Sequence, residues 1–174
     1  MTAIPRYLFA NCSGLKEITI PDTVTTIKES AFTNCANLTD IDFSIGVKTI
    51  GDRAFANCTS LAEVEIPANI ETIGIRAFQK CTKLEKVTLN EGLVSLGERS
   101  FGDTKISSIY IPASLNDVSL YDRVGVFENC ASLNDITFGE GMTAIPRYLF
   151  ARSEERREGK ECTAESRSRW SPYH

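Results

Sequence analysis

The sequence predicts a solenoid, a stack of similar coils that share one continuous apolar core. Two observations support this prediction: cysteines recur at a fixed interval, and the residues around them repeat in phase. Gaps of 23 residues separate Cys12, Cys35, Cys58 and Cys81, and Cys130 follows 49 residues after the last of these. A unit of this length cannot bury its apolar side alone, so the units must stack on one another.

Six units and part of a seventh align on these cysteines. The first four are MTAIPRYLFANCSGLKEITIPDT, VTTIKESAFTNCANLTDIDFSIG, VKTIGDRAFANCTSLAEVEIPAN and IETIGIRAFQKCTKLEKVTLNEG. The fifth, LVSLGERSFGDTKISSIYIPAS, is one residue short and loses the cysteine. The sixth, LNDVSLYDRVGVFENCASLNDITFGEG, is four residues longer than the norm. The seventh begins at Met142, where the decapeptide Met1–Ala10 returns unchanged.

Each unit predicts a short turn followed by one strand. In the second unit, polar and apolar side chains alternate from Asp40 to Phe43, as in a half-buried strand. The segment ESAF at 29–32 is too short for a stable helix, so it predicts a helical or 3₁₀ turn. The side chains expected to face the core are those of Val24, Ile27, Ala31, Phe32, Cys35, Leu38, Ile41 and Phe43.

Proline and glycine mark the ends of these segments. A proline follows the expected strand in three units, where its missing N–H can end a hydrogen-bond ladder. A glycine follows the Ile or Leu of the turn-forming segment in three units, which predicts a tight corner. These residues are Pro21, Pro67 and Pro112, and Gly51, Gly74 and Gly97.

The repeated motif IGxxAFxxCxxLxxIxIP, seen as IGDRAFANCTSLAEVEIP in the third unit, resembles the BspA-type leucine-rich repeat. This repeat is common in surface proteins of gut and oral bacteria and of some parasitic protists. The resemblance covers Met1–Ala151 and implies a curved leucine-rich-repeat solenoid. It implies a parallel β-sheet on one face, with short helical or 3₁₀ turns and loops on the other. It further implies adhesion or host-protein binding at a cell surface or after secretion.

Residues 152–174 leave the pattern. They contain six basic and five acidic residues without an apolar period, and Cys162 lies off the cysteine register. A solvated charged tail is one interpretation, and a basic arm containing RSRW is another. We favour a third, in which the segment is a non-native disordered tail, because RSEERR, GKEC and RSRWSPYH resemble a translated sequencing-library adapter. On this interpretation the chain is a fragment, with Met1 an internal codon and 1–151 its repeat array.

Bulk composition narrows the class of protein. The chain has 42% apolar and 24% charged residues, which is typical of a soluble domain. Its net charge of −4 argues against nonspecific nucleic-acid binding. No stretch approaches the ~18 apolar residues of a membrane span, so we expect no membrane-spanning segment in it.

The cysteines have two interpretations. In-register residues on adjacent coils lie about 5 Å apart, which would allow disulfides if the Cβ vectors agreed. Repetition alone also produces such a column, and free cysteine behaves as a small buried hydrophobe. We expect a buried, unpaired column. The absence of CxxC and of a glycine-rich phosphate loop predicts no metal site and no cofactor.

Outward strand positions supply the candidate binding residues. We expect a binding face formed by Glu17, Asp40, Asp42, Glu63, Glu65, Lys86, Tyr110 and Asp135. A solvated acidic face is one interpretation, binding of a basic partner is another, and the paired carboxylates of a glycan hydrolase are a third. Catalysis is disfavoured because an open face cannot raise one carboxyl pKa above another. Apart from His174, no histidine is present to activate a serine or cysteine.

The sixth unit carries its extra residues near Ser119–Gly125. Insertions in solenoids often form loops on a binding face, although neutral drift is an alternative interpretation. The resemblance to the BspA-type family implies a non-enzymatic surface protein fragment that mediates adhesion or binds a protein or glycan, and the acidic outward positions favour a basic partner such as a host surface or matrix protein. The alternative is an architectural spacer within a longer surface protein.

Overall fold

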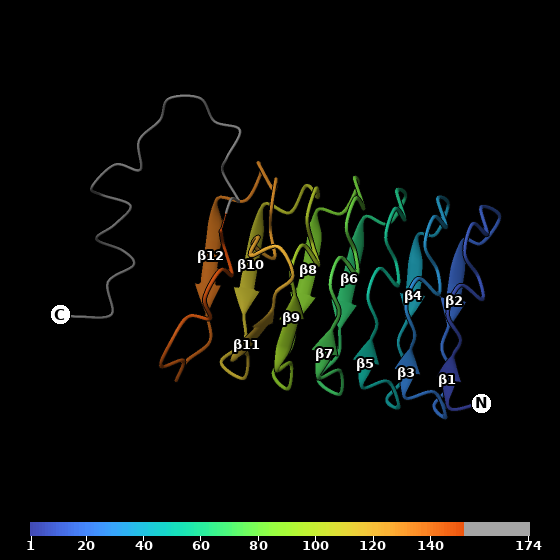
Figure 1. Cartoon of the computed structure of the whole chain (residues 1–174), viewed down its shortest axis with the longest axis horizontal. Helices are drawn as coiled ribbons and strands as arrows, with labels where there is room; N and C mark the ends of the chain where they lie inside the picture. The colour runs from blue at the N-terminus through green and yellow to red at the C-terminus, as the bar shows by residue number, and fades with distance from the viewer. Residues whose placement is uncertain (152–174) are drawn as a thin grey trace.

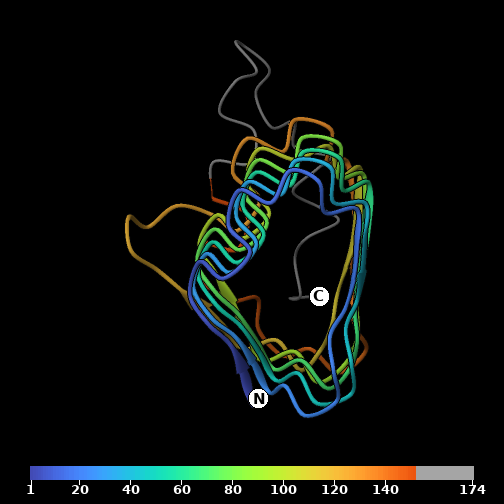
Figure 2. The same ribbon diagram turned by 90° about the vertical axis from the view of Figure 1, so that its right-hand side faces the viewer.

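Two rows of short strands run along the molecule, one strand of each row in every full coil (Figure 1). The structure is a computed structural model, and it describes residues 1–151. Viewed down the stack, successive coils overlie one another around a common interior (Figure 2). The predicted solenoid is therefore confirmed as a parallel β-solenoid. The interpretation of 152–174 as a non-native tail concerns residues outside the described part of the chain and stays a prediction.

The first row is a six-stranded parallel sheet, which we call the back sheet. Its order is β1-β3-β5-β7-β9-β11. The strands are β1 (Ala3–Ile4), β3 (Thr26–Ile27), β5 (Thr49–Ile50), β7 (Thr72–Ile73), β9 (Ser95–Gly97) and β11 (Asp117–Ser119). The 23-residue period sets the register, so that Thr26 pairs with Thr49 and Ile50 with Ile73. This second sheet was not expected from the sequence, because strands of two or three residues are too short to show an alternation.

The second row contains the strands that the sequence predicts. They are β2 (Glu17–Thr19), β4 (Asp40–Asp42), β6 (Glu63–Ile66), β8 (Lys86–Leu89), β10 (Ser108–Ile111) and β12 (Asp135–Phe138). Their ladder is parallel but interrupted, with hydrogen-bonded pairs β2–β4, β6–β8 and β10–β12. Within residues 1–151, no strand pairing joins β4 to β6 or β8 to β10. We call the outward side of this row the front face.

The expectation of helical or 3₁₀ turns is wrong. Residues 1–151 contain no helix, and hence none long and apolar enough to cross a membrane. Residues 29–34 and 36–37 instead form turns, in which Ser30 and Asn34 have φ of 54° and 60°. Alternate N–H groups then reach the next coil, as when Phe32 N donates to Ala54 O at 2.8 Å. A helix would direct these donors along its own axis, so inter-coil bonding excludes it.

The corner glycines are required by close backbone approach. Neither Gly74 nor Gly97 has a positive φ. A Cβ on Gly97 would lie 2.3 Å from the carbonyl carbon of Gly74, and a Cβ on Gly74 would lie 2.6 Å from that of Gly51. The backbone of the preceding coil therefore leaves no room for a side chain at Gly74 or Gly97.

A column of phenylalanines occupies the core. The expected column of Phe32, Phe55 and Phe78 is buried, with stacked rings whose centroids lie 5.1–5.2 Å apart. The stack continues at both ends through Phe9, Phe101, Phe127 and Phe150. Of the core set predicted for the second unit, all are buried except Ile41 and Phe43, which are half-buried and pack against the core.

The five cysteines of the described region are free. Cys58 and Cys81 are buried, and each directs its Sγ at a carbonyl of the preceding coil, at 3.4 Å and 3.3 Å. Thr104 takes the column position that the fifth unit lacks, and its Oγ1 lies 3.2 Å from the Sγ of Cys130. The structure thus places these thiols in the expected unpaired column, which is buried except for Cys12, the half-buried residue at its N-terminal end.

Replacing Phe55 with Ala should destabilise the fold by about 3–5 kcal/mol, because the ring is fully buried between two stacked neighbours. Urea unfolding followed by circular dichroism measures the loss. The matched control is Phe9→Ala, which removes a half-buried ring with one stacked neighbour and should cost clearly less. A loss below about 1 kcal/mol for Phe55→Ala would contradict the described core.

The cysteine column should be unreactive in the folded protein. Burial raises the pKa of the Cys81 thiol to about 12, and that of Cys58 also rises because of burial, so little thiolate forms at pH 8. We expect iodoacetamide to modify Cys12 first and to spare Cys58 and Cys81 until denaturant is added. Peptide mass mapping measures this. If iodoacetamide modified a cysteine within 1–151 only when reductant was added together with denaturant, that cysteine would be in a disulfide. This result would contradict the column of free thiols.

Candidate ligand-binding face

The front face carries the eight residues that the sequence singles out. Alternation along each strand turns every second side chain outward, so all eight are exposed. Register places Glu17 beside Asp40, Glu63 beside Lys86, and Ser108 beside Asp135. The structure therefore gathers these residues on one surface, where the two interruptions of the strand row divide them.

An acidic hollow lies at the first interruption. It has a volume of about 410 Å³, and its lining includes Asp40 and Asp42 of β4 and Glu63 and Glu65 of β6. Its cation is Lys86, whose Nζ lies 3.6 Å from Glu63 Oε2. Both partners of that ion pair are more than 70% exposed, so water weakens it. The acidic hollow thus holds four carboxylates against one ammonium.

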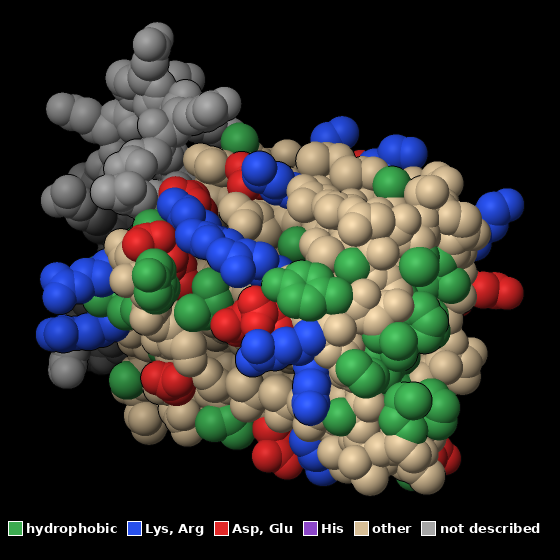
Figure 3. Space-filling view, turned by 45° about the vertical axis from the view of Figure 1, so that its right-hand side comes forward, with side chains coloured by type: hydrophobic (Ala, Val, Ile, Leu, Met, Phe, Trp, Pro, Cys, Tyr) green, Lys and Arg blue, Asp and Glu red, His purple; other side chains and the backbone are tan. Residues whose placement is uncertain are grey.

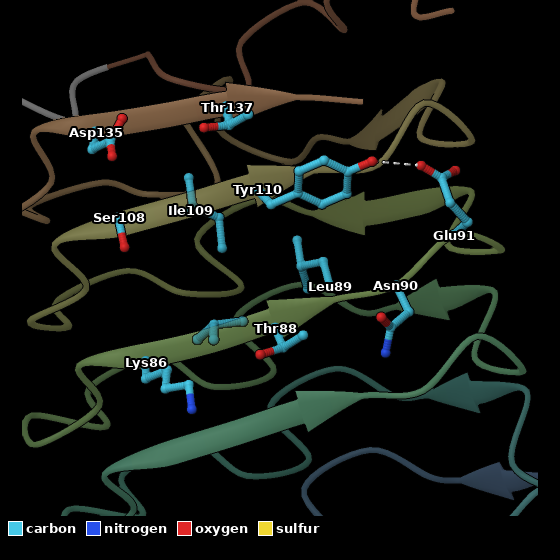
Figure 4. Close-up of a pocket in the computed structure, with 11 residues that line it drawn as sticks. Lys86, Thr88, Leu89, Asn90, Glu91, Ser108, Ile109, Tyr110, Asp135 and Thr137 are labelled. Atoms are coloured by element: carbon cyan, nitrogen blue, oxygen red, sulfur yellow. Dashed lines mark hydrogen bonds between the residues drawn. The ribbon is translucent and has the colours of Figure 1, made fainter. Parts of the chain in front are cut away.

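An aromatic hollow lies at the second interruption (Figure 4). Its volume is about 570 Å³, and its floor includes the buried side chains of Leu89 and Ile109. Tyr110 lies along one side, and the residue is 40% exposed. Polar side chains complete the lining: Lys86, Thr88, Asn90, Glu91, Ser108, Asp135 and Thr137.

Glu91 fixes the ring of Tyr110. The Tyr110 hydroxyl donates to Glu91 Oε1 at 2.9 Å, and the same carboxylate accepts the N–H groups of Ala113 and Ser114 at 3.0 and 3.1 Å. The bond from Ala113 is the largest of the contacts that hold the pKa of Glu91 below its ordinary value. The bond to this carboxylate raises the pKa of Tyr110. Gly139 leaves the space, since a Cβ there would lie 2.7 Å from the Tyr110 hydroxyl.

Sequence reasoning missed Asn90 and Glu91. Both follow β8 in a turn, one coil before Tyr110, where the neighbouring units have Pro67–Ala68 and Pro112–Ala113. The replacement of Pro-Ala by Asn-Glu in this unit was the sequence signal that could have identified these two residues. Of the predicted residues, Glu17 lines neither hollow, whereas Lys86 lines both and so connects them.

The inserted segment of the sixth coil forms a loop that projects from the stack (gold in Figure 2). Its base is held by Glu98, a fully buried carboxylate that accepts the N–H groups of Tyr121, Asp122 and Val124 at 2.8, 2.7 and 3.3 Å. Asp122 also accepts from Arg76 at 3.2 Å. The loop is therefore anchored at its base, while the Tyr121 side chain is 80% exposed.

Charges of both signs are intermingled on the side drawn in Figure 3, and apolar side chains gather toward the N-terminal end. Oppositely charged groups elsewhere in the structure form pairs, as Arg6 does with Glu29 at 3.5 Å and Arg76 with Asp122 at 3.2 Å. In the acidic hollow, by contrast, the negative charges outnumber the one positive charge. No group of three or more His, Cys, Asp or Glu within residues 1–151 is arranged to hold a metal ion.

These coils match the model of the BspA type leucine rich repeat region over residues 2–122 and 123–158, with six copies. The chain belongs to this family. A comparison with curated proteins finds no significant relative. Solved structures of other leucine-rich repeat proteins are similar to this chain.

One similar structure is a leucine rich cell surface protein from Faecalibacterium prausnitzii, at 28% identity and a TM-score of 0.59, covering 80% of this chain and 44% of that one. The T. pallidum leucine-rich repeat protein TpLRR is 26% identical, with a TM-score of 0.64 and coverage of 80% and 67%. The pneumococcal vaccine antigen PcpA, at 24% identity, a TM-score of 0.65 and coverage of 82% and 37%, shares the fold. The chain thus spans less than half of the Faecalibacterium protein.

The anchoring of the inserted loop should depend on pH. Burial raises the pKa of Glu98, but the three N–H donors and Arg99 together outweigh it and leave the pKa below its ordinary value. Such a carboxylate stabilises the fold above the unfolded pKa, and this contribution is lost as pH falls through the folded pKa. We expect the amide proton shifts of Tyr121, Asp122 and Val124 to titrate together with a midpoint below about 4.3.

The control for this titration is Glu98→Gln, which should remove the shared transition while leaving the amide shifts of the front strands in place. A midpoint at or above the ordinary glutamate value, or an unchanged transition in Glu98→Gln, would contradict the anchoring role of this carboxylate.

Proposed function

We propose that this protein is a non-enzymatic binding module of a cell-surface protein. In this proposal, its front face binds a protein partner that carries a basic patch. The observation that supports this proposal best is the acidic hollow, where four exposed carboxylates face one lysine. Residues 1–151 form the binding array in this proposal. The surface localisation draws on the Faecalibacterium relative, which is described as a cell surface protein.

Repulsion within the acidic hollow favours a basic partner. Like charges held close together repel each other, and Asp40 and Asp42 of β4 share one hollow with Glu63 and Glu65 of the neighbouring β6. A basic patch would relieve this repulsion on binding. Since the field of several like charges extends about one Debye length, it would also accelerate the encounter.

The rigid scaffold supports binding more than catalysis. The carboxylates project from strands whose inward neighbours are core residues, such as Val64 between Glu63 and Glu65. A surface already held in place loses little entropy when a partner docks. The same surface is open to water, whereas general acid catalysis by a carboxyl group needs an environment that disfavours its ionised form.

Charge reversal in the acidic hollow tests the proposal. We expect Asp42→Lys with Glu65→Lys to slow association with immobilised basic extracellular-matrix proteins by tenfold or more at low salt, and by less at 0.5 M salt. Surface plasmon resonance measures the association rates. The matched control is Asp22→Lys with Glu71→Lys, which makes the same change in net charge at two exposed positions away from both hollows.

If the two double variants slowed association equally, the binding would depend on net charge alone. This result would contradict a specific front-face site. Binding confined to acidic matrix proteins, or unaffected by Asp42→Lys with Glu65→Lys, would also overturn the proposal.

A further inference from the structure

We propose that the aromatic hollow is a glycan-binding site, in which a neutral pyranose stacks on the ring of Tyr110. This inference rests on the proposed binding role of the front face, and it assigns a second ligand class to a part of that face outside the acidic hollow. The argument uses the fixed ring, the polar lining, the charge of the hollow and the interruption of the strand row.

The orientation of the Tyr110 ring is fixed before a ligand binds. Its hydroxyl is bonded to Glu91, which in turn is bonded to the backbone of Ala113 and Ser114. Figure 4 shows the ring lying along β10 and pointing toward Glu91. A pyranose presents a face of C–H groups, and packing this face on an aromatic ring removes apolar surface of both partners from water. Since the ring is already oriented, little side-chain entropy is lost on binding.

The rim carries the groups that hydroxyl-rich ligands require. Asn90 offers its amide oxygen, because its Nδ2 already donates to Ile66 O at 3.1 Å and to Glu65 Oε1 at 3.4 Å. Asp135 offers a carboxylate and Ser108 a hydroxyl, and all three residues are exposed or half-buried around the floor. Hydroxyl groups of a sugar both donate and accept hydrogen bonds, so this mixture of donors and acceptors matches them. The volume of about 570 Å³ lies within the range of small-ligand sites.

Charge distinguishes this hollow from the acidic one. Lys86 contributes one positive charge against the two negative charges of Glu91 and Asp135, compared with one against four in the acidic hollow. The oxygens of Glu91 also already accept bonds from Tyr110, Ala113 and Ser114. A basic peptide would therefore gain less here than from the four carboxylates of β4 and β6. A neutral ligand with many hydroxyl groups fits better.

The interruption of the strand row separates the walls of the hollow. The fifth unit is one residue shorter than the period, and its strand β10 pairs with β12 but not with β8. β8 and β10 are nevertheless neighbours. The open seam between them is where the floor residues Leu89 and Ile109 come to line the hollow.

The experiment titrates the full chain with cellohexaose, mannohexaose and chitohexaose, and follows binding by saturation-transfer NMR and calorimetry. At least one should bind the native protein. Tyr110→Ala should then weaken that glycan by about fivefold or more, as expected for a contributing aromatic contact. Tyr110→Phe keeps the ring and should stay within about threefold of the native affinity.

The matched control is Tyr121→Ala, which removes an exposed tyrosine from the inserted loop and should leave glycan affinity unchanged. Thermal midpoints establish that each variant is folded. Absence of binding by all three glycans, or equal losses in Tyr110→Ala and Tyr121→Ala, would overturn the glycan site.

The outcomes separate this inference from the proposed function. Asp42→Lys, at a residue that lines only the acidic hollow, should impair the basic protein partner and leave the glycan unaffected. If Tyr110→Ala abolishes binding of the basic protein and no glycan binds, the hollow belongs to the protein interface and the glycan inference is wrong. If the glycan binds through Tyr110 and the matrix proteins do not bind at the acidic hollow, the proposed function is wrong and the glycan inference is supported.

Discussion

In-register stacking of coils is the constraint on which the rest of this structure depends. A coil supplies backbone donors to one neighbour along the strands and to the other along the turns. Lys48 N, for example, reaches back to Thr25 O, and Phe55 N reaches forward to Ala77 O. Both sets of bonds form only if every coil repeats the path of the one before. Stacking then converts each repeated residue into a column, which is why phenylalanines, cysteines and corner glycines line up. Changing one member of a column changes the surroundings of its two neighbours.

The departures from this repetition are where local chemistry appears. The front strand β10 of the short coil pairs with β12 and not with β8, just as β6 of a full-length coil pairs with β8 and not with β4. A coil four residues longer keeps its register in both strand rows by displacing the excess into a loop. The loop has its own anchor in Glu98, at a position that is exposed or half-buried in earlier coils as Asp52 and Ile75. The regular coils thus provide the scaffold, and the irregular fifth and sixth provide surface features found nowhere else in residues 1–151.

The features that recur in every coil could be predicted from the sequence, whereas the features that occur in one coil could not. The 23-residue spacing was sufficient for the solenoid, the front strands and the Phe32 column, because each is stated several times over. The turns were misassigned, since ESAF has ordinary helical composition and nothing in it shows that Ser30 adopts a positive φ. The back sheet escaped notice because Thr49–Ile50 is two residues long. The bond from Tyr110 to Glu91 could not be predicted either, because it joins a strand to a turn one coil earlier through side chains that occur once.

Two kinds of ligand chemistry on one face have a physical rationale in this architecture. Outward side chains of a solenoid strand make no contact with the core, so they can change without loss of core packing, while the ladder holds their spacing constant. In the proposed binding roles, the acidic hollow would attract its partner through a long-range, salt-sensitive field, and the aromatic hollow would contact its ligand at short range through a fixed ring. Lys86 and Thr88 line both hollows, so the two form neighbouring parts of one surface. A glycosylated partner with a basic patch would engage both at once, and the second contact would then be intramolecular. Because an intramolecular contact avoids a second loss of translational freedom, two weak sites on a rigid face can together hold such a partner firmly.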